Sequence, residues 1–329
     1  MKTFLIWILF AVGLVALMLG LRSAASATIR DGVAAWPDIQ REPGEAAFRV
    51  VFPDGETLEF PSTPRAILPA NAAFVDMLSV LVDADRIRAL PKESNEYSRL
   101  RSADPDLKSW SELPHFGSYG AETILPFEPD LILVHAWQKA DVTALLRNEG
   151  LPVVLLPLPR RWEDIDRALL VLGRILDVES RAERIIEQQR LRIEALRSRS
   201  PFAGLRAISY TNLGTGGTVA GSGTTADILF GLAGLENAAA SAGLIEYQSL
   251  DLEGLLRMDP DVIVVDGAHS DAKSPPTAAF LYAQEGLENM RAIRGKRVIA
   301  ISTELFTTTS QELLRGAEIL VAELEKRGL

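Results

Sequence analysis

Two segments of the chain show the same succession of apolar and polar positions. They read AETILPFEPDLILV at Ala121–Val134 and LEGLLRMDPDVIVV at Leu252–Val265. In each, a short stretch of mixed polarity ends at Pro-Asp, and a continuous apolar run follows. Proline interrupts a helix and favours a turn, and an unbroken apolar run is typical of a parallel strand covered on both faces. The pattern therefore predicts a short helix, a turn and a buried strand, present twice.

Two further pairs of segments extend this repeat. RAI opens a predicted strand, followed by a helix, at Arg65–Leu81 and again at Arg206–Gly234, and a glycine turn precedes a strand at Gly150–Pro159 and at Gly295–Thr303. Each half therefore alternates strands and helices, as parallel sheets wound with helices do. The predicted fold class is α/β, with two Rossmann-like lobes and a ligand cleft between them.

A long polar helix is predicted between the two halves. From Trp162 to Pro201 apolar residues recur at helical spacing, with a break near Asp177, and the segment from Glu179 to about Ser198 is mostly charged. A helix with this pattern contacts protein on one side only, and it extends for about 30 Å at about 1.5 Å per residue. We expect one long α-helix to join the lobes and to permit only small opening motions.

The N-terminal segment differs from the rest of the chain. Lys2 precedes an uncharged apolar run at Phe4–Leu21, and Ala25-Ser26-Ala27 follows. This order is typical of a secretory signal that is cleaved after Ala27, whereas the length of the run also suits a retained membrane anchor. Both alternatives export the remainder. The predicted organisation is a signal peptide or anchor at 1–27, a tether at 28–46, an N-terminal lobe at 47–178, a linking helix at 179–200 and a C-terminal lobe at 201–329.

Composition narrows the function classes. The formal net charge is −10 and no basic run is present, which argues against nucleic-acid binding. The chain has no cysteine, which excludes disulfides, thiolate metal sites and cysteine nucleophiles.

The order of several segments resembles the periplasmic-binding protein family of ABC importers for iron-siderophore, haem and vitamin B12. The resembling segments are Val50–Ile67, Gly117–Leu133, Tyr247–Asp266 and Arg291–Ser302. The resemblance implies a monomeric extracytoplasmic substrate-binding protein that captures a metal chelate and delivers it to a permease. An iron-siderophore is the first choice of ligand, with cobalamin or haem as alternatives. The resemblance implies no catalytic residue, no cofactor and no resident metal.

The resemblance also gives the repeated acid a role. Glu122 and Glu253 occupy matching positions, and in the family one exposed acid on each lobe meets arginines of the permease. Carboxylate–guanidinium pairs are strong and geometrically selective. The alternative is that each acid only favours the first turn of a short helix, where the helix dipole attracts an anion.

Ligand-binding residues are expected beyond the carboxyl ends of the strands, where ligands of wound α/β folds gather. Aromatic side chains there could stack on a planar ligand, and arginines could pair with its carboxylates or catecholate oxygens; the alternatives are packing at the rim and exposure to solvent. The candidates are Asn71, Tyr97, His135, Trp137, Arg160, Arg161, Trp162, Tyr210, Asn212, His269 and Phe306.

Two histidines and a glycine-rich run have competing interpretations. His135 and His269 could ligate a metal together with Asp266 or Glu304, but no close histidine spacing supports this, and a hydrogen bond to the ligand or a structural role is the commoner use. The run Thr211–Thr225 follows a strand and precedes a helix, yet it lacks the lysine of a phosphate-binding loop. We interpret it as a flexible loop that lines the cleft.

Two other functions remain open at this stage. One is an exported enzyme that uses the cleft, although no catalytic constellation supports it. The other is a membrane-tethered sensor or scavenger of chelates that never docks on a permease.

Overall fold

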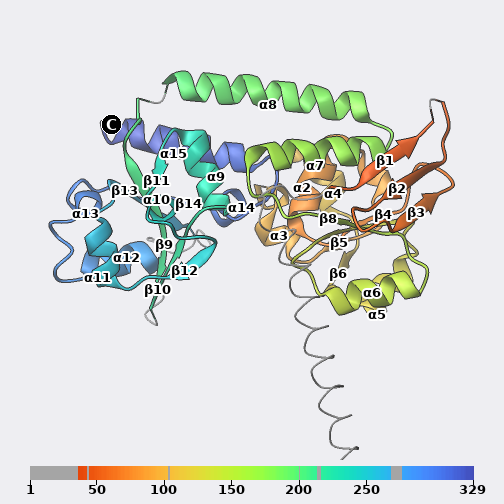
Figure 1. Cartoon of the computed structure of the whole chain (residues 1–329), viewed down its shortest axis with the longest axis horizontal. Helices are drawn as coiled ribbons and strands as arrows, with labels where there is room; N and C mark the ends of the chain where they lie inside the picture. Colours follow the sequence, from red (N-terminus) through yellow and green to blue (C-terminus); the bar gives the residue numbers. More distant parts are fainter. Residues whose placement is uncertain (1–35, 43, 103, 200, 213–215, 268–275) are drawn as a thin grey trace, which may run out of the picture. The chain divides into compact units, whose positions relative to one another are not determined.

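Apolar parallel strands form the centre of each half of the molecule (Figure 1). The computed structural model describes residues 36–42, 44–102, 104–199, 201–212, 216–267 and 276–329. We call the part of the chain before the long helix α8 the first lobe and the part after it the second lobe. Helix α8 runs from Glu179 to Arg199.

The first lobe is built on a parallel sheet in the order β4-β7-β8. Its central strand, β7, is buried at every residue, as the continuous apolar run predicted. Leu68, Ile132 and Val134 pack there with Phe116 and Leu146 in one hydrophobic core. The elements of this lobe are β1 (Asp38–Arg41), β2 (Phe48–Val51), β3 (Thr57–Phe60), β4 (Ile67–Pro69), α2 (Ala72–Leu81), β5 (Leu90–Pro91), α3 (Ser94–Tyr97), α4 (Lys108–Ser111), β6 (His115–Phe116), α5 (Ala121–Ile124), the 3-10 helix η4 (Leu125–Phe127), β7 (Leu131–His135), α6 (Ala140–Asn148), β8 (Val153–Leu156) and α7 (Trp162–Ile175).

The second lobe contains a mixed sheet in the order β12-β10-β9-β13-β14, with β11 also paired to β9. Strands β9, β11, β13 and β14 are parallel, whereas β10 and β12 run antiparallel to their neighbours. Its elements are β9 (Arg206–Asn212), β10 (Gly217–Ala220), α9 (Thr225–Ala233), β11 (Glu236–Asn237), α10 (Ala238–Ser241), β12 (Tyr247–Ser249), α11 (Leu252–Met258), β13 (Val262–Asp266), α12 (Pro276–Ala283), α13 (Arg291–Arg294), β14 (Val298–Ile301), α14 (Thr303–Phe306) and α15 (Leu313–Lys326).

The repeated Pro-Asp turns have the same structural task in both lobes. The carboxylate of Asp130 accepts the backbone N–H groups of Arg65 and Ala66, both at 2.7 Å. The carboxylate of Asp261 accepts the backbone N–H of Arg206 at 2.9 Å. Each aspartate thus ties the start of its own strand to the start of the neighbouring strand. The duplication read from the sequence is therefore present in the hydrogen bonds.

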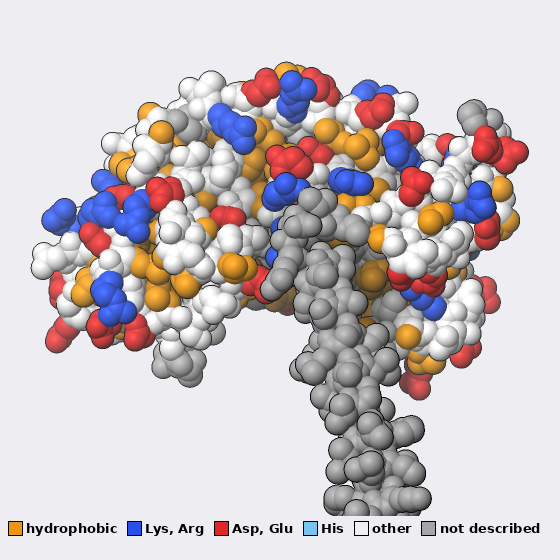
Figure 2. Space-filling view, in the orientation of Figure 1, with side chains coloured by type: hydrophobic (Ala, Val, Ile, Leu, Met, Phe, Trp, Pro, Cys, Tyr) orange, Lys and Arg blue, Asp and Glu red, His pale blue; other side chains and the backbone are white. Residues whose placement is uncertain are grey.

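Helix α8 follows the predicted pattern of one protein-facing side. Ala182 and Ile193 are buried, and α8 packs against α7, α9 and α15. Arg192, which is half-exposed, pairs with Glu318 of α15 at 2.8 Å. Figure 2 shows acidic and basic side chains interspersed over this upper surface, as expected of a solvated helix face.

The structure corrects the predicted tether at 28–46. From residue 38 this segment forms β1, which pairs antiparallel with β2, and the Arg41 guanidinium donates to the carbonyl of Ile175 at 3.2 Å. The predicted signal or anchor at 1–27 lies outside the described residues, and so does the tether up to residue 35. The chain divides into the units 1–36 and 37–329. Within the part that the structure describes, no helix has the length and apolar character to cross a membrane.

The glycine-rich run is also corrected in part. Strand β9 continues to Asn212, and the antiparallel strand β10 runs from Gly217 to Ala220, so half of the described run belongs to these two paired strands. A Cβ atom on Gly217 would collide with the Tyr210 hydroxyl oxygen. This glycine therefore permits the close approach of the two strands. Of the residues of the run that the structure describes, those from Gly223 to Thr225 line the cleft described below.

Candidate ligand-binding cleft

A cavity of about 480 Å³ lies between the two lobes. This volume falls in the usual range of small-molecule sites. The first lobe contributes loops that follow β4, β7 and β8, as expected at the carboxyl ends of parallel strands. The second lobe contributes the start of α9, the residues before β12 and the loop at Thr307–Thr309 after α14.

Two helices begin at this cavity, one from each lobe. Asn71 precedes α2, and its side chain accepts the Phe74 N–H at 3.2 Å and donates to Gln138 at 3.0 Å. Thr224 precedes α9 and accepts the Asp227 N–H at 3.3 Å. Both Asn71 and Thr224 line the cavity. The positive ends of two helix dipoles are therefore close to the site, which favours an anionic group there.

Aromatic side chains from both lobes line the cavity. Tyr97 and Trp137 belong to the first lobe and Tyr247 to the second. Trp137 is 60% exposed and Tyr247 is 62% exposed, which is unusual for side chains that gain so much from burial. Their exposure leaves planar apolar surface available to a ligand on both sides of the cleft.

One ion pair joins the lobes across the cavity. The Arg160 guanidinium, after β8, donates to the Glu246 carboxylate, just before β12. Glu246 has a left-handed backbone with φ 57°, held by hydrogen bonds with Gly221 at 2.8 Å and Ser222 at 3.0 Å. Arg160 is thus a cleft cation whose partner comes from the opposite lobe.

A further acid borders the cavity on the first lobe. Burial raises the pKa of Glu93, and a hydrogen bond with the backbone of Ala72 opposes this shift. Glu93 is therefore easier to protonate than an exposed carboxylate. It gives the first-lobe wall a group that can become neutral when a ligand covers it.

The structure brings four predicted site residues together. Asn71, Tyr97, Trp137 and Arg160 all line the cavity. Arg161 and Trp162 do not; they line a separate hollow of about 190 Å³ next to α9. Arg161 lies 3.8 Å from Asp164, its neighbour at the start of α7. Contact of any of these residues with a ligand stays a prediction.

Four other candidates are buried and are not among the residues that line the cavity, so their contact with a ligand stays a prediction. Tyr210 and Asn212 lie on β9 with Asn212 donating to the Tyr210 hydroxyl at 3.1 Å, so these side chains partner each other inside the lobe. Phe306 ends α14 and is buried in the second lobe. His135, at the end of β7, is fully buried and stacks on Phe74 with ring centroids 4.3 Å apart.

The histidine alternatives are resolved only for the first lobe. Burial lowers the pKa of His135 to about 4, so its ring is neutral at pH 7, and its place in the core makes it structural. His269 lies outside the described residues. Asp266 accepts the Thr303 hydroxyl at 2.5 Å, and Glu304 lies 3.6 Å from Arg101. The described residues contain no group of three or more histidine and acidic side chains arranged to hold a metal.

Sequence reasoning missed several residues of the cleft. Glu93, Glu246 and Tyr247 line it but were not among the candidates, whereas Thr224 belongs to the run Thr211–Thr225 that was expected to line the cleft. Thr224 carried a usable signal, because a threonine directly before a helical segment is a common N-cap. Glu246 and Tyr247 carried none, since the pairing of β12 with β10 brings them to the cleft.

Comparisons with known proteins agree with this architecture. The family model described as periplasmic binding protein matches residues 71–305. A search of the curated proteins found none that matches. Among solved structures, the chain is similar to a periplasmic binding protein of Veillonella parvula (15% identity, TM-score 0.73, covering 90% of this chain and 99% of that one). It is also similar to the periplasmic heme-binding protein HutB of Vibrio cholerae (22% identity, TM-score 0.68, covering 79% of this chain and 98% of that one). A third similar structure is an ABC-type Fe3+-hydroxamate transport protein of Saccharomonospora viridis (20% identity, TM-score 0.66, covering 82% of this chain and 96% of that one).

Proposed function

Because the chain belongs to the periplasmic binding protein family, we propose that it captures a metal chelate outside the cytoplasm and delivers it to an ABC importer. The family comprises non-enzymatic components of transport systems. An iron-siderophore is the first candidate ligand, with heme and cobalamin as alternatives. The neighbours named above for heme and for Fe3+-hydroxamate support a chelate as the ligand class.

The cleft is the observation that carries this proposal. It offers about 480 Å³ between the lobes, aromatic surface on both walls and one arginine. Aromatic rings suit the flat, apolar body of an organic chelator, and the guanidinium suits its acidic groups. The dipoles of α2 and α9 add to the attraction for negative charge.

The test is a binding titration of the purified chain that starts at residue 28. Ferric trihydroxamate, ferric catecholate, hemin and cobalamin would each be added while tryptophan fluorescence is recorded. We expect saturable quenching with a micromolar or lower Kd for one of these chelates, because Trp137 lines the cleft. Failure of all four to bind would contradict the proposed ligand class.

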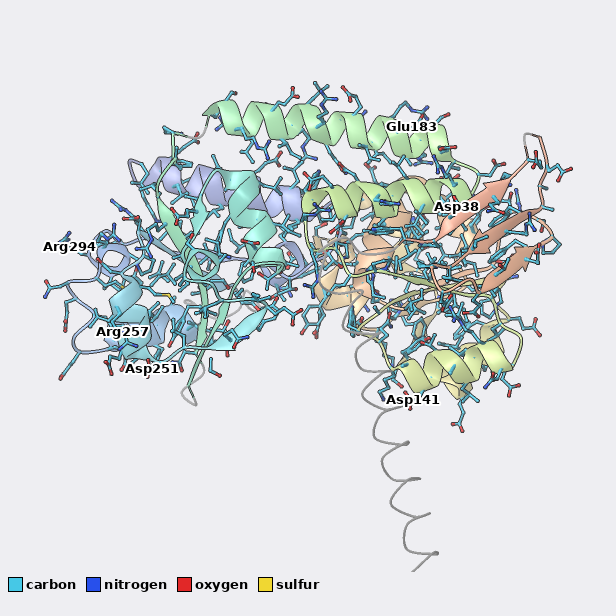
Figure 3. The ribbon with its side chains drawn as sticks, viewed as in Figure 1. Asp38, Asp141, Glu183, Asp251, Arg257 and Arg294 are labelled. Carbon is cyan, nitrogen blue, oxygen red and sulfur yellow. The ribbon has the colours of Figure 1, made fainter. Side chains whose placement is uncertain are left out.

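We further propose that Glu122 and Glu253 dock the protein on its permease. Both side chains are exposed and lie in the first turn of α5 and α11. In Figure 1 these two helices lie on the side of the molecule away from α8. Figure 3 places Arg257, the ion-pair partner of Glu253 at 2.6 Å, on this same side.

Charge reversal tests the docking separately from ligand capture. Glu122→Lys combined with Glu253→Lys should abolish uptake by intact cells and leave the Kd of the chelate unchanged. Loss of chelate affinity would contradict the assignment. Normal uptake would contradict docking through these two acids.

A further inference from the structure

An exposed leucine accompanies each of the two acids at the same distance along the chain. Leu125 follows Glu122 by three positions and is 39% exposed, and Leu256 follows Glu253 by three positions and is 42% exposed. Residues three apart on a helical turn are neighbours on its surface. Each lobe therefore presents a carboxylate next to an aliphatic side chain.

The surrounding structure fixes the two leucines in the same way. The residue before each one, Ile124 or Leu255, is fully buried and anchors its turn in the core of its lobe. Each turn then ends three residues after its leucine in a left-handed residue, Glu128 with φ 45° or Asp259 with φ 38°. The buried residue before each leucine and the left-handed residue three positions after it fix the backbone of the turn. The leucine side chain is therefore directed away from the core.

Exposed leucines are common singly and need no explanation. A leucine that stays exposed at the same place in both copies of a motif is different, because the two lobes otherwise diverge around it. At the next position the first lobe has Pro126 and the second has Arg257. Besides the left-handed acidic residue at the end of each turn, the shared surface elements of the two turns are the first acid and the leucine.

We propose that each acid–leucine pair is one docking contact, in which the leucine enters an apolar hollow beside the arginine of a permease subunit. This inference rests on the proposed docking function and adds the residues that give it affinity. Exposed charge pairs steer encounter and contribute little binding energy. A leucine side chain that becomes buried in the complex removes apolar area from water, and this contributes binding energy.

The duplication indicates the form of the partner. Two equivalent contacts on one chain match a permease that presents the same hollow twice, as a pair of related subunits does. The charge is consistent with this partner, because the protein is acidic overall, with a formal net charge of −10, and a site that carries arginines would complement it. In the second lobe the Arg257 guanidinium donates a hydrogen bond to the Glu253 carboxylate. A permease arginine must compete with Arg257 there, so we expect the leucine to contribute a larger share of the binding energy at this contact.

Site-specific photocrosslinking in the native cells tests the proposal without knowledge of the chelate. The full chain would carry p-benzoylphenylalanine in place of Leu125 or Leu256. Matched controls would carry it in place of Leu191 and Ile319, which are 57% and 39% exposed on α8 and α15, away from α5 and α11. We expect crosslinks to a membrane subunit of an ABC permease from the first pair, at least tenfold more than from the controls.

A second measurement uses variants that keep both acids. Cells would be fixed with formaldehyde and the amount of permease that co-purifies with the protein measured; this amount is the permease retention. Leu125→Ser combined with Leu256→Ser should lower it at least tenfold. Leu191→Ser combined with Ile319→Ser should leave this amount within twofold of the parent. Thermal melts would establish that both double variants are folded.

The outcomes separate this inference from the docking function on which it rests. If Glu122→Lys with Glu253→Lys removes permease retention while the leucine double variant keeps it, the leucine contact is overturned and docking through the acids stands. If neither set of changes affects retention and no permease crosslink forms, both are overturned.

Discussion

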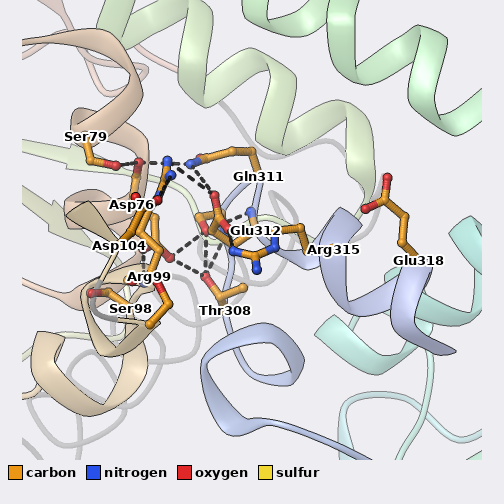
Figure 4. Close-up of polar contacts among 12 residues, drawn as sticks. Asp76, Ser79, Ser98, Arg99, Asp104, Thr308, Gln311, Glu312, Arg315 and Glu318 are labelled. Atoms are coloured by element: carbon orange, nitrogen blue, oxygen red, sulfur yellow. Dashed lines mark hydrogen bonds and ion pairs between the residues drawn. The ribbon is translucent and has the colours of Figure 1, made fainter. Parts of the chain in front are cut away.

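Asp76 of the first lobe accepts a hydrogen bond from the Ser310 hydroxyl of the second lobe at 2.9 Å, inside the protein. The Asp76 side chain is fully buried, and the Gln311 amide donates to its backbone carbonyl at 2.9 Å. Thr308, which lines the cleft, lies 3.3 Å from the same carboxyl oxygen. Figure 4 shows these side chains converging from α2 and from the segment before α15. A polar junction thus joins the lobes directly behind the ligand cleft.

The polar junction contains two carboxyl groups, those of Asp76 and Glu312, and the guanidinium groups of Arg99 and Arg315 lie near Glu312. Burial, together with repulsion by Glu312, raises the pKa of Asp76 to about 8. Arg99 is 3.8 Å from Glu312 and also donates its backbone N–H to Asp76 at 2.8 Å, while Arg315 lies 3.5 Å from Glu312. The two arginines neutralise Glu312, so Asp76 is the member of the cluster that keeps its proton at pH 7.

The first prediction concerns the pH dependence of stability. The folded pKa of Asp76, about 8, lies above its ordinary value of 3.8. The folded state therefore holds a proton that the unfolded state has lost, and its contribution to stability falls as pH rises from 4 to 8. Asp76→Asn keeps the acceptor for Arg99 and removes the titration. We expect the variant to flatten the slope of unfolding free energy by up to about 1.4 kcal/mol per pH unit.

Urea unfolding between pH 5 and 9 measures this difference. Asp106→Asn is the matched control, because Asp106 is an exposed aspartate of the same lobe. The control should keep the slope of the parent. If unfolding free energy depended on pH equally in Asp76→Asn and in the parent, Asp76 would have an ordinary pKa in the folded state.

The second prediction concerns the ion pair across the cleft. A ligand carboxylate must compete with Glu246 for the Arg160 guanidinium. Glu246→Gln should therefore tighten the binding of an anionic chelate such as hemin by up to about fivefold, since an exposed pair is worth up to about 1 kcal/mol. Arg160→Gln should weaken it. Titrations at low and high salt would check both, and tighter binding of hemin to Arg160→Gln would contradict the role assigned to the arginine.

The third prediction concerns the aromatic walls of the cleft. Trp137 and Tyr247 expose their rings on opposite lobes. Trp137→Ala and Tyr247→Ala should each weaken chelate binding by roughly tenfold, because each removes a stacking surface. Tyr282→Ala is the control, since Tyr282 is an exposed tyrosine on α12. Equal affinities for all three variants and the parent would place the ligand elsewhere.

The fold could be predicted from the sequence because its signals are local and occur twice. Each Pro-Asp turn leads to an apolar strand, and the strands around Ile132 and Ile263 are buried as their composition requires. The site could be predicted where it depends on the same signals. Asn71, Trp137 and Arg160 closely follow parallel strands, and all three reach the cleft.

The rest of the site depends on contacts between distant segments. Tyr247 lines the cleft because it pairs with Ala220 of β10, and no local pattern specifies that pairing. His135 shows that a residue at the end of a strand need not reach the cleft. Its side chain lies in the core, where it stacks on Phe74. Strand ends locate a site, whereas side-chain direction depends on the packing of the whole lobe.

The last prediction concerns the close packing of α7 on α8. Gly173 lies in α7, and a Cβ atom there would come within 2.8 Å of the Ala182 Cβ on α8. Gly173→Ala should therefore force the helices apart and destabilise the protein by about 1–3 kcal/mol. Gly231 lies in α9, and a Cβ atom added to it would meet no heavy atom within 4 Å, so Gly231→Ala should stabilise the protein by about 0.5–1 kcal/mol through helix propensity alone. Denaturant midpoints measure both, and a stabilising Gly173→Ala would show that α8 can move away from α7 without cost.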